Sequence, residues 1–250
     1  MGISLKTEHL KRYKDIAWLF MKYGRGDLVK HAGLEEAIEG TETLNPEVPA
    51  KAEELANDLE RMGPTFIKLA QLLSTRSDLL PMPYLEALSR LQDSVEPFSF
   101  GEVEEIVASE LGVRISKAFS EFVAVPLAAA SLGQVHRATM RDGRPVVVKV
   151  QRPHIREQIV KDLEAMQEIA EFLDRHTEIG RRYEFQPMLD EFRKSLLREL
   201  DYRQEARNLV TFAENLREFE NIIVPQPVDD YTTSRVLTMD YVRGRKITDL

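Results

Sequence analysis

One lysine lies in an otherwise apolar stretch, and its surroundings suggest phosphate chemistry. Lys149 sits in PVVVKVQ, downstream of the small-residue segment AAASLG that spans residues 128–133. Small residues let backbone N–H groups come close to phosphate oxygens, and a lysine supplies the complementary positive charge. These features predict a phosphate-binding loop followed by a phosphate-binding lysine. The loop residues concerned are Ala128, Ala129, Ala130, Ser131 and Gly133.

The spacing matches the kinase pattern G-x-G-x-x-G-x-V, followed by a strand that carries a lysine. Ala128 and Ala130 stand where the first two glycines are expected, while Gly133 and Val135 match. Two alternatives stay open from the residues alone. An alanine run is more often helical, and Lys149 could reach solvent from an edge strand.

A lysine on such an apolar strand needs a partner, because an unpaired buried charge is costly. The segment ELDYRQEARN offers Glu199, Asp201 and Glu205 on a predicted helix. Asp201 and Glu205 are four residues apart and are expected on one face, with Glu199 pointing to one side. The alternative is a solvated face on which these acids pair with neighbouring arginines.

A second polar set occurs in GPTFIKLAQLLSTRSDLLP. Lys68, Gln71 and Thr75 follow i, i+3, i+7 spacing on a predicted helix that is otherwise rich in Leu, Ile and Phe. A stripe of this period faces either solvent or a polar cavity.

The secondary structure that must position these residues is predicted to change along the chain, from helices alone to a mixture of strands and helices. Residues 1–115 predict an all-helical extension, with helices near 8–23, 50–62, 64–80, 83–92 and 101–111. Residues 116–250 predict three strands with a hairpin turn at Asp142-Gly143, then a helix after Pro153. A long helix from Pro187 to Leu216 and two strands, in IIVPQPVDD and SRVLTMDYV, follow. This order predicts the α+β class, an antiparallel sheet with helices on one side.

Composition excludes several kinds of protein. The net charge of −8 argues against a nucleic-acid binder, and the absence of cysteine excludes disulfides and cysteine-ligated metals. No H-x3-H or HExxH spacing occurs among the five histidines, so no metal site is predicted. No apolar run suits a membrane span and no signal peptide is apparent, which makes the cytoplasm the expected compartment. The amphipathic segment 8–23 is expected to pack on its own protein, with binding to a membrane surface as the alternative.

Taken together and in this order, the motifs resemble the UbiB family of atypical protein-kinase-like proteins, which includes the ADCK proteins. FIKLAQLLSTRSDLLP is similar to the family's K-x-G-Q helix, with Lys68 and Gln71 matching and Ala70 in place of glycine. AAASLGQVHRA resembles its alanine-rich loop and VVVKVQRP its lysine-bearing strand. ELDYRQEARN resembles its E-x-D helix.

The resemblance implies a role for each position. Lys149 would contact the α- and β-phosphates of ATP or ADP bound with Mg²⁺, and would pair with Glu205. Glu199 and Asp201 would engage the K-x-G-Q helix, whose Lys68 and Gln71 would face the pocket. In TMDYV, Met239 would precede a hinge whose backbone, from Asp240 to Val242, would face adenine.

The resemblance also implies a function in isoprenoid quinone (ubiquinone) biosynthesis, as a kinase or ATPase. The expected partners are an isoprenoid lipid or quinone-biosynthesis enzymes at the inner face of a membrane, and no nucleic acid. No H-x-D-x4-N or DFG motif occurs before Leu250, so the metal ligands are expected in a C-terminal lobe and this chain alone is expected to be inactive. The alternative function is a non-catalytic helical module that binds a lipid or a partner.

Overall fold

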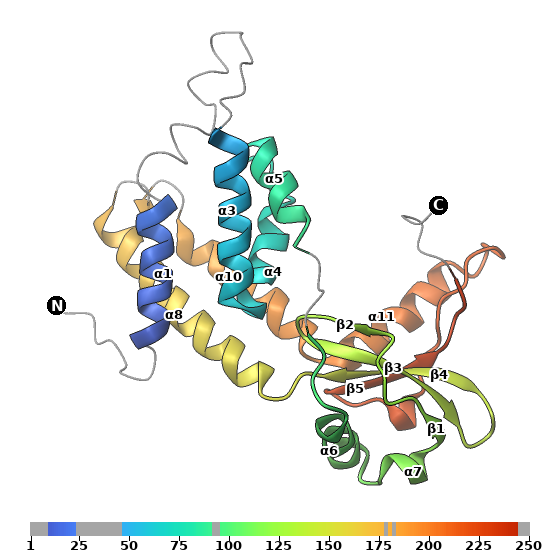
Figure 1. Cartoon of the computed structure of the whole chain (residues 1–250). Coiled ribbons are helices and arrows are strands. Elements are labelled where there is room, and N and C mark those ends of the chain that lie inside the picture. Colours follow the sequence, from blue (N-terminus) through green and yellow to red (C-terminus); the bar gives the residue numbers. More distant parts are fainter. Residues whose placement is uncertain (1–9, 24–46, 92–95, 178–179, 182–183, 245–250) are drawn as a thin grey trace. The chain divides into compact units, whose positions relative to one another are not determined.

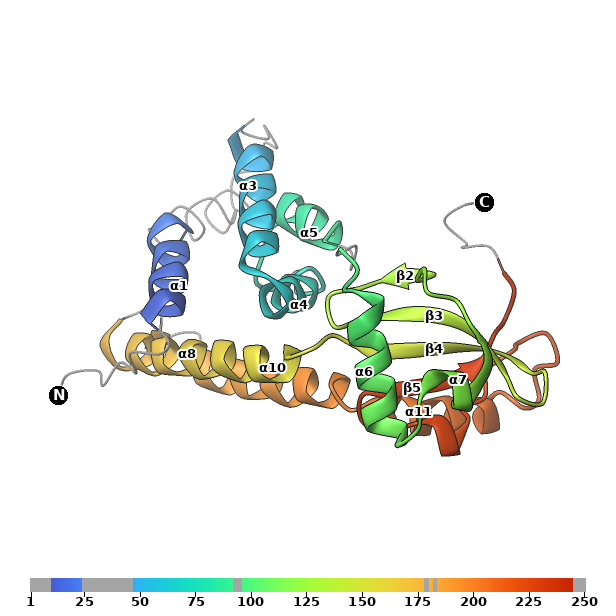
Figure 2. The same ribbon diagram turned by 60° about the horizontal axis from the view of Figure 1, so that its bottom comes forward.

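The structure is a computed structural model that describes residues 10–23, 47–91, 96–177, 180–181 and 184–244. It divides into two compact units, a helical unit (Met1–Asp93 with Arg156–Lys194) and a sheet unit (Ser94–Ile155 with Ser195–Leu250). Figures 1 and 2 show the elements of each unit. The contacts therefore group the chain differently from the expected division at residue 115, because helix α6 belongs with the sheet.

The helical unit is built from amphipathic helices around a core that includes Ala56, Leu59, Phe66 and Leu88. Its helices are α1 (Leu10–Tyr23), α3 (Glu47–Met62), α4 (Pro64–Leu73), α5 (Met82–Ser89), most of α8 (Ile155–His176) and the first part of α10 (Phe185–Glu199). Helix α4 begins at a proline, whose missing N–H costs nothing in the first turn. It ends at Leu73, so Thr75 lies beyond the helix on which the sequence placed it.

Helix α1 is amphipathic, as expected, and packs on its own unit. Tyr13, Ile16 and Tyr23 are buried. Two of its basic residues are used internally, since Arg12 pairs with Asp162 and Lys22 pairs with Asp58. These contacts favour the packed helix over the membrane-surface alternative. Within the described residues, no helix is both long enough and apolar enough to cross a bilayer.

The sheet unit holds an antiparallel sheet whose main strand order is β1-β3-β4-β5, with β2 beside β3. The strands are β1 (Phe119–Phe122), β2 (Ala128–Ala129), β3 (Gly133–Met140), β4 (Pro145–Gln151) and β5 (Val236–Asp240). The predicted hairpin joins β3 to β4, and Gly143 takes the positive φ of 90° that its turn requires. Because β4 lies between β3 and β5, Lys149 is on an interior strand, and the edge-strand alternative is wrong.

Helices cover both faces of this sheet, not one as the sequence predicted. Helix α6 (Phe100–Leu111) packs on the face that carries Val146, Val148 and Val150. Helix α11 (Tyr202–Asn215) packs on the opposite face, against Leu237. The short helices α7 (Ile115–Ala118) and η3 (Asp229–Tyr231) complete the unit.

Two predicted elements differ in the structure. The long helix expected through residue 216 breaks after Glu199, and α11 starts at Tyr202 as a separate helix. The segment IIVPQPVDD is not a strand, and its contribution to the sheet is a single bridge between Pro227 and Met239. Its prolines have no N–H to donate to a ladder, which accounts for this difference.

Candidate functional site

The side chain of Lys149 lies on the α11 face of the sheet, flanked by Val135 on β3 and Leu237 on β5. Its Nζ donates to both carboxylate oxygens of Glu205, at 3.0 and 2.8 Å. The same Nζ lies 4.8 Å from the ring centroid of Tyr202. The lysine is therefore held between a negative charge and the face of an aromatic ring, and Glu205 is the carboxylate that the sequence analysis chose.

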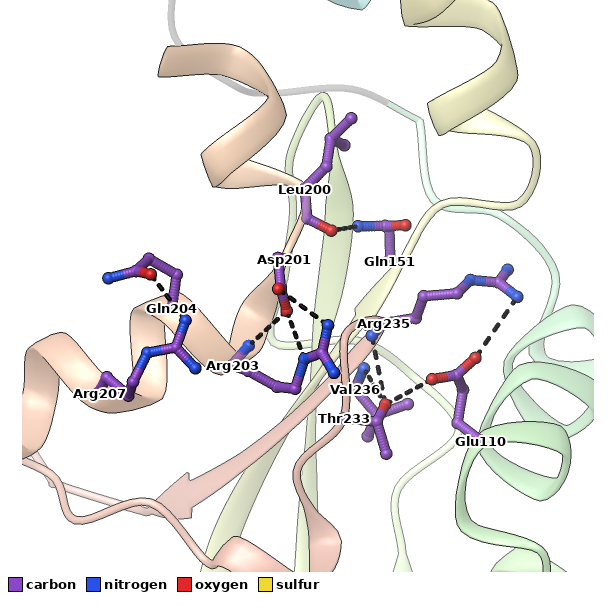
Figure 3. A network of polar contacts seen from close by, with 10 residues as sticks. All are labelled: Glu110, Gln151, Leu200, Asp201, Arg203, Gln204, Arg207, Thr233, Arg235 and Val236. Carbon is purple, nitrogen blue, oxygen red and sulfur yellow. Dashed lines mark hydrogen bonds and ion pairs between the residues drawn. The ribbon is translucent and has the colours of Figure 1, made fainter. Parts of the chain in front are cut away.

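The start of α11 fixes these two partners. Asp201 is the N-cap, and its carboxylate accepts hydrogen bonds from the backbone N–H and the guanidinium of Arg203 (Figure 3). The Tyr202 N–H donates to the carbonyl of Ser234, which ties the first turn to the segment before β5. The sequence predicted that Asp201 and Glu205 share a helical face. This prediction is wrong, because Asp201 precedes the helix as its N-cap. The hydrogen bond from Arg203 holds the pKa of Asp201 below its ordinary value.

A second contact holds the short segment between the end of α10 and the start of α11. The Gln151 side chain donates to the carbonyl of Leu200 at 2.9 Å, so the end of β4 is joined to the residue between the two helices (Figure 3). Gln151 is buried and lies on the same face of β4 as Lys149. Glu199, the last residue of α10, directly precedes this junction.

Tyr202 is the residue of this site that the sequence analysis missed. Its side chain is 1% exposed, and among the described residues no group lies in hydrogen-bonding position to its hydroxyl. Burial, with the nearby charges of Glu205 and Glu199, raises the pKa of the phenol, which stays neutral. The available signal was its position three residues before Glu205, which places both side chains on neighbouring positions of one helix.

The predicted loop is present as β2, a turn and the first residue of β3. The Ala130 N–H donates to the carbonyl of Gly133 at 2.8 Å, and Ser131 is fully buried. A Cβ at residue 133 would lie 2.4 Å from the carbonyl oxygen of Val150 and 2.5 Å from the hydroxyl of Tyr202. Gly133 is therefore required by close packing. Ala128 is exposed and Ala129 and Ala130 are half-buried, so this part of the loop is accessible.

The segment after β5 is tied to the sheet by its backbone and by one acidic side chain. The carboxylate of Asp240 pairs with Arg144 and accepts from the N–H of Gln226. The N–H of Asp240 donates to the carbonyl of Gln226, and Val242 is 41% exposed. The Asp240 side chain is thus engaged in structural contacts, and any contact with adenine would involve other groups.

Lys68 and Gln71 belong to the helical unit. Both are half-buried on α4, and the side chain of Gln71 donates to the carbonyl of Leu91 at 2.9 Å. Ala70, which stands where the resemblance expects glycine, is fully buried. The structure brings Lys149, Glu205 and Gly133 together in the sheet unit, whereas Lys68 and Gln71 are described within their own unit only.

Comparisons with known proteins show what the chain is similar to. Residues 90–250 match the model of the ABC1 atypical kinase-like domain. The chain is 43% identical to the chloroplastic protein ACTIVITY OF BC1 COMPLEX KINASE 8 of Arabidopsis thaliana, over 78% of this chain and 26% of that protein. It is 33% identical to a probable protein kinase UbiB of Aliivibrio fischeri, over 98% of this chain and 46% of that protein.

A solved structure is similar as well. The protein Rv3197 of Mycobacterium tuberculosis, solved in complex with erythromycin, matches with a TM-score of 0.53 and 31% identity, over 72% of this chain and 45% of that one. The chain thus spans less than half the length of the relatives it matches. The α+β sheet unit is kinase-like, and the chain belongs to the ABC1 atypical kinase family, whose members include proteins named UbiB.

Proposed function

We propose that this chain supplies the phosphate-binding part of an ATP site. The observation that carries the proposal is the ammonium of Lys149, held by both oxygens of Glu205 on an interior strand and facing the same side of the sheet as Gly133. A lysine fixed by a helix carboxylate is the arrangement that kinases use to hold the α- and β-phosphates. The loop 128–133 would cover these phosphates, since its small residues let backbone N–H groups approach closely.

An apolar surface beside Lys149 suits the base of the nucleotide. By strand register, Val135, Val147 and Met239 lie on the same face of the sheet as the lysine. Leu127, directly before the loop, is 53% exposed. Apolar side chains with a few convergent polar groups are the usual lining of a small-molecule site. Adenine would pack on this surface, with the backbone of residues 240–242 at its edge.

For the whole protein we propose a UbiB-type kinase or ATPase that supports isoprenoid quinone biosynthesis at a membrane surface. The family membership and the relatives named as probable protein kinases UbiB support this proposal. Bound Mg²⁺ would neutralise the phosphate charge. The described residues contain no group of three or more acidic or histidine side chains that could hold a metal. The groups that we assign to the nucleotide in this chain are the lysine, its carboxylate and the loop.

Lys149→Met in the complete protein tests the proposal, with Lys117→Met as the matched control. Lys117 is an exposed lysine in the same unit, on α7. We expect Lys149→Met to abolish binding of Mg-ATP measured by calorimetry, because the charge that faces the phosphates is lost, while the circular dichroism spectrum stays unchanged. Lys117→Met should bind as the wild type does. If both variants are folded and bind Mg-ATP equally well, the proposed role of Lys149 is wrong.

A further inference from the structure

Lys149 has two partners on α11, and the kinase-like arrangement accounts for only one of them. Glu205 supplies the charge, whereas the ring of Tyr202 lies 4.8 Å from Nζ and is almost completely buried. We propose that Tyr202 is a positioning residue, whose ring fixes the place of the Lys149 ammonium together with Glu205. The consequence for ATP rests on the function proposed above, but the contact itself does not.

The two partners differ in how firmly they hold the lysine. The Glu205 side chain is 39% exposed and that of Lys149 is 28% exposed. An ion pair that water reaches is weakened by screening and by side-chain freedom. An aromatic ring held in the core is rigid, and its attraction for a cation is larger where solvent is reduced. Tyr202 therefore positions the ammonium together with Glu205, which also balances its charge.

The hydroxyl of Tyr202 is buried, and among the described residues no group lies in hydrogen-bonding position to it. This hydroxyl lies 2.5 Å from the place where a Cβ of residue 133 would be. The side chain of Tyr202 thus lies against both Gly133 of the loop and Lys149. The backbone N–H of Tyr202 donates to the carbonyl of Ser234. The loop and the lysine are consequently placed by the same residue.

A nuclear magnetic resonance experiment on the 250-residue chain reads this contact directly. The chain is labelled with ¹³Cε-lysine, which leaves the ammonium unmodified, and the Lys149 resonance is assigned by its absence in Lys149→Arg. A methylene group above a ring is shifted upfield, so we expect an upfield Lys149 resonance in the wild type and in Tyr202→Phe. In Tyr202→Leu it should move to the position of exposed lysines.

Phe119→Leu is the matched control, because it removes a buried ring from the core on the opposite, α6-facing side of the same sheet. It should leave the Lys149 resonance upfield. A Lys149 resonance at the exposed position in the wild type itself would overturn the proposal, and this outcome does not depend on whether Tyr202→Leu folds.

Titration with Mg-ATP in the complete protein supplies the second readout. We expect Tyr202→Leu to lose about tenfold in affinity, the equivalent of one cation–π contact, and Tyr202→Phe to restore most of it. Wild-type affinity in Tyr202→Leu, with binding abolished in Lys149→Met, would refute Tyr202 as a positioning residue but leave the ATP site standing. If the wild type binds no Mg-ATP, the proposed function fails, and the Lys149 resonance alone decides whether the contact exists.

Discussion

A buried carboxylate joins three helices of the helical unit, and removing its main partner gives a sharp test of how that unit is held together. Asp162 on α8 is 2% exposed. It accepts two hydrogen bonds from the guanidinium of Arg12 on α1, at 2.5 and 3.0 Å, and one from Thr65 on α4, at 2.6 Å. The substitution Arg12→Met keeps much of the packing volume and, among the described residues, leaves the threonine hydroxyl as the hydrogen-bond donor to the carboxylate.

The expected loss follows from burial. Removing one member of a fully buried ion pair costs about 3–5 kcal/mol, because the remaining charge is uncompensated. Arg12 is 22% exposed, so water reaches part of the site, and the Thr65 bond remains. We therefore expect Arg12→Met to lower the free energy of unfolding by about 2–3 kcal/mol. Adding Asp162→Asn removes the stranded charge and should recover about half of that loss.

Urea unfolding followed by the fluorescence of Trp18 measures these changes. Trp18 is the only tryptophan of the sequence and lies on α1, so its signal reports the helical unit. Lys14→Met is the control, since Lys14 is exposed on the same helix. The reasoning would be refuted if Arg12→Met lowered the free energy of unfolding by no more than Lys14→Met does. It would also be refuted if the double variant were no more stable than Arg12→Met alone.

Two further predictions concern the sheet unit. Burial lowers the pKa of His136 from 6.5, and the ring is held neutral, with one nitrogen facing a backbone carbonyl and the other the amide of Gln134. As the pH falls, His136 is protonated in the unfolded chain before it is protonated in the folded chain. Its contribution to the free energy of unfolding is therefore fully present above pH 6.5 and is lost as the pH drops below that value. Melting temperatures between pH 7.5 and 5 should fall less in His136→Leu than in the wild type, and equal slopes would contradict this. Gly133→Ala should cost about 3 kcal/mol or more, because its Cβ meets the backbone of Val150, whereas Gly143→Ala, with open space but positive φ, should cost about 1 kcal/mol. Similar urea midpoints for the two glycine variants would show that the close packing at Gly133 has been misjudged.

The local signals of the sequence predicted the central hairpin well. Because successive side chains of a strand point to opposite faces, Val146, Val148 and Val150 of PVVVKVQ share one face, and all three are completely buried. Asp142-Gly143 predicted the turn, because only a residue that tolerates positive φ fits there. These features depend on neighbours in the chain, which is why they can be read without a structure.

The position of β4 inside the sheet has a different origin. Its second neighbour is β5, which lies far along the chain and pairs Leu237 with Lys149. No local pattern specifies a pairing over such a distance. The same holds for α6 and α11, because the sequence predicted helices in both regions but not that they cover opposite sides of the sheet. The pairing of β4 with the distant strand β5 thus decides whether Lys149 faces bulk solvent or the candidate site.

The break before α11 shows how one capping residue redirects a site. A continuous helix would have carried Asp201 and Glu205 on one face, as the sequence suggested. Asp201 instead caps the new helix, since aspartate satisfies the free N–H groups of a first turn better than it serves a helix interior. This places Tyr202 and Glu205 in the first turn, where both reach Lys149. Because the Asp201 carboxylate already holds the N–H and the guanidinium of Arg203, any other ligand of Asp201 would share the carboxylate with Arg203.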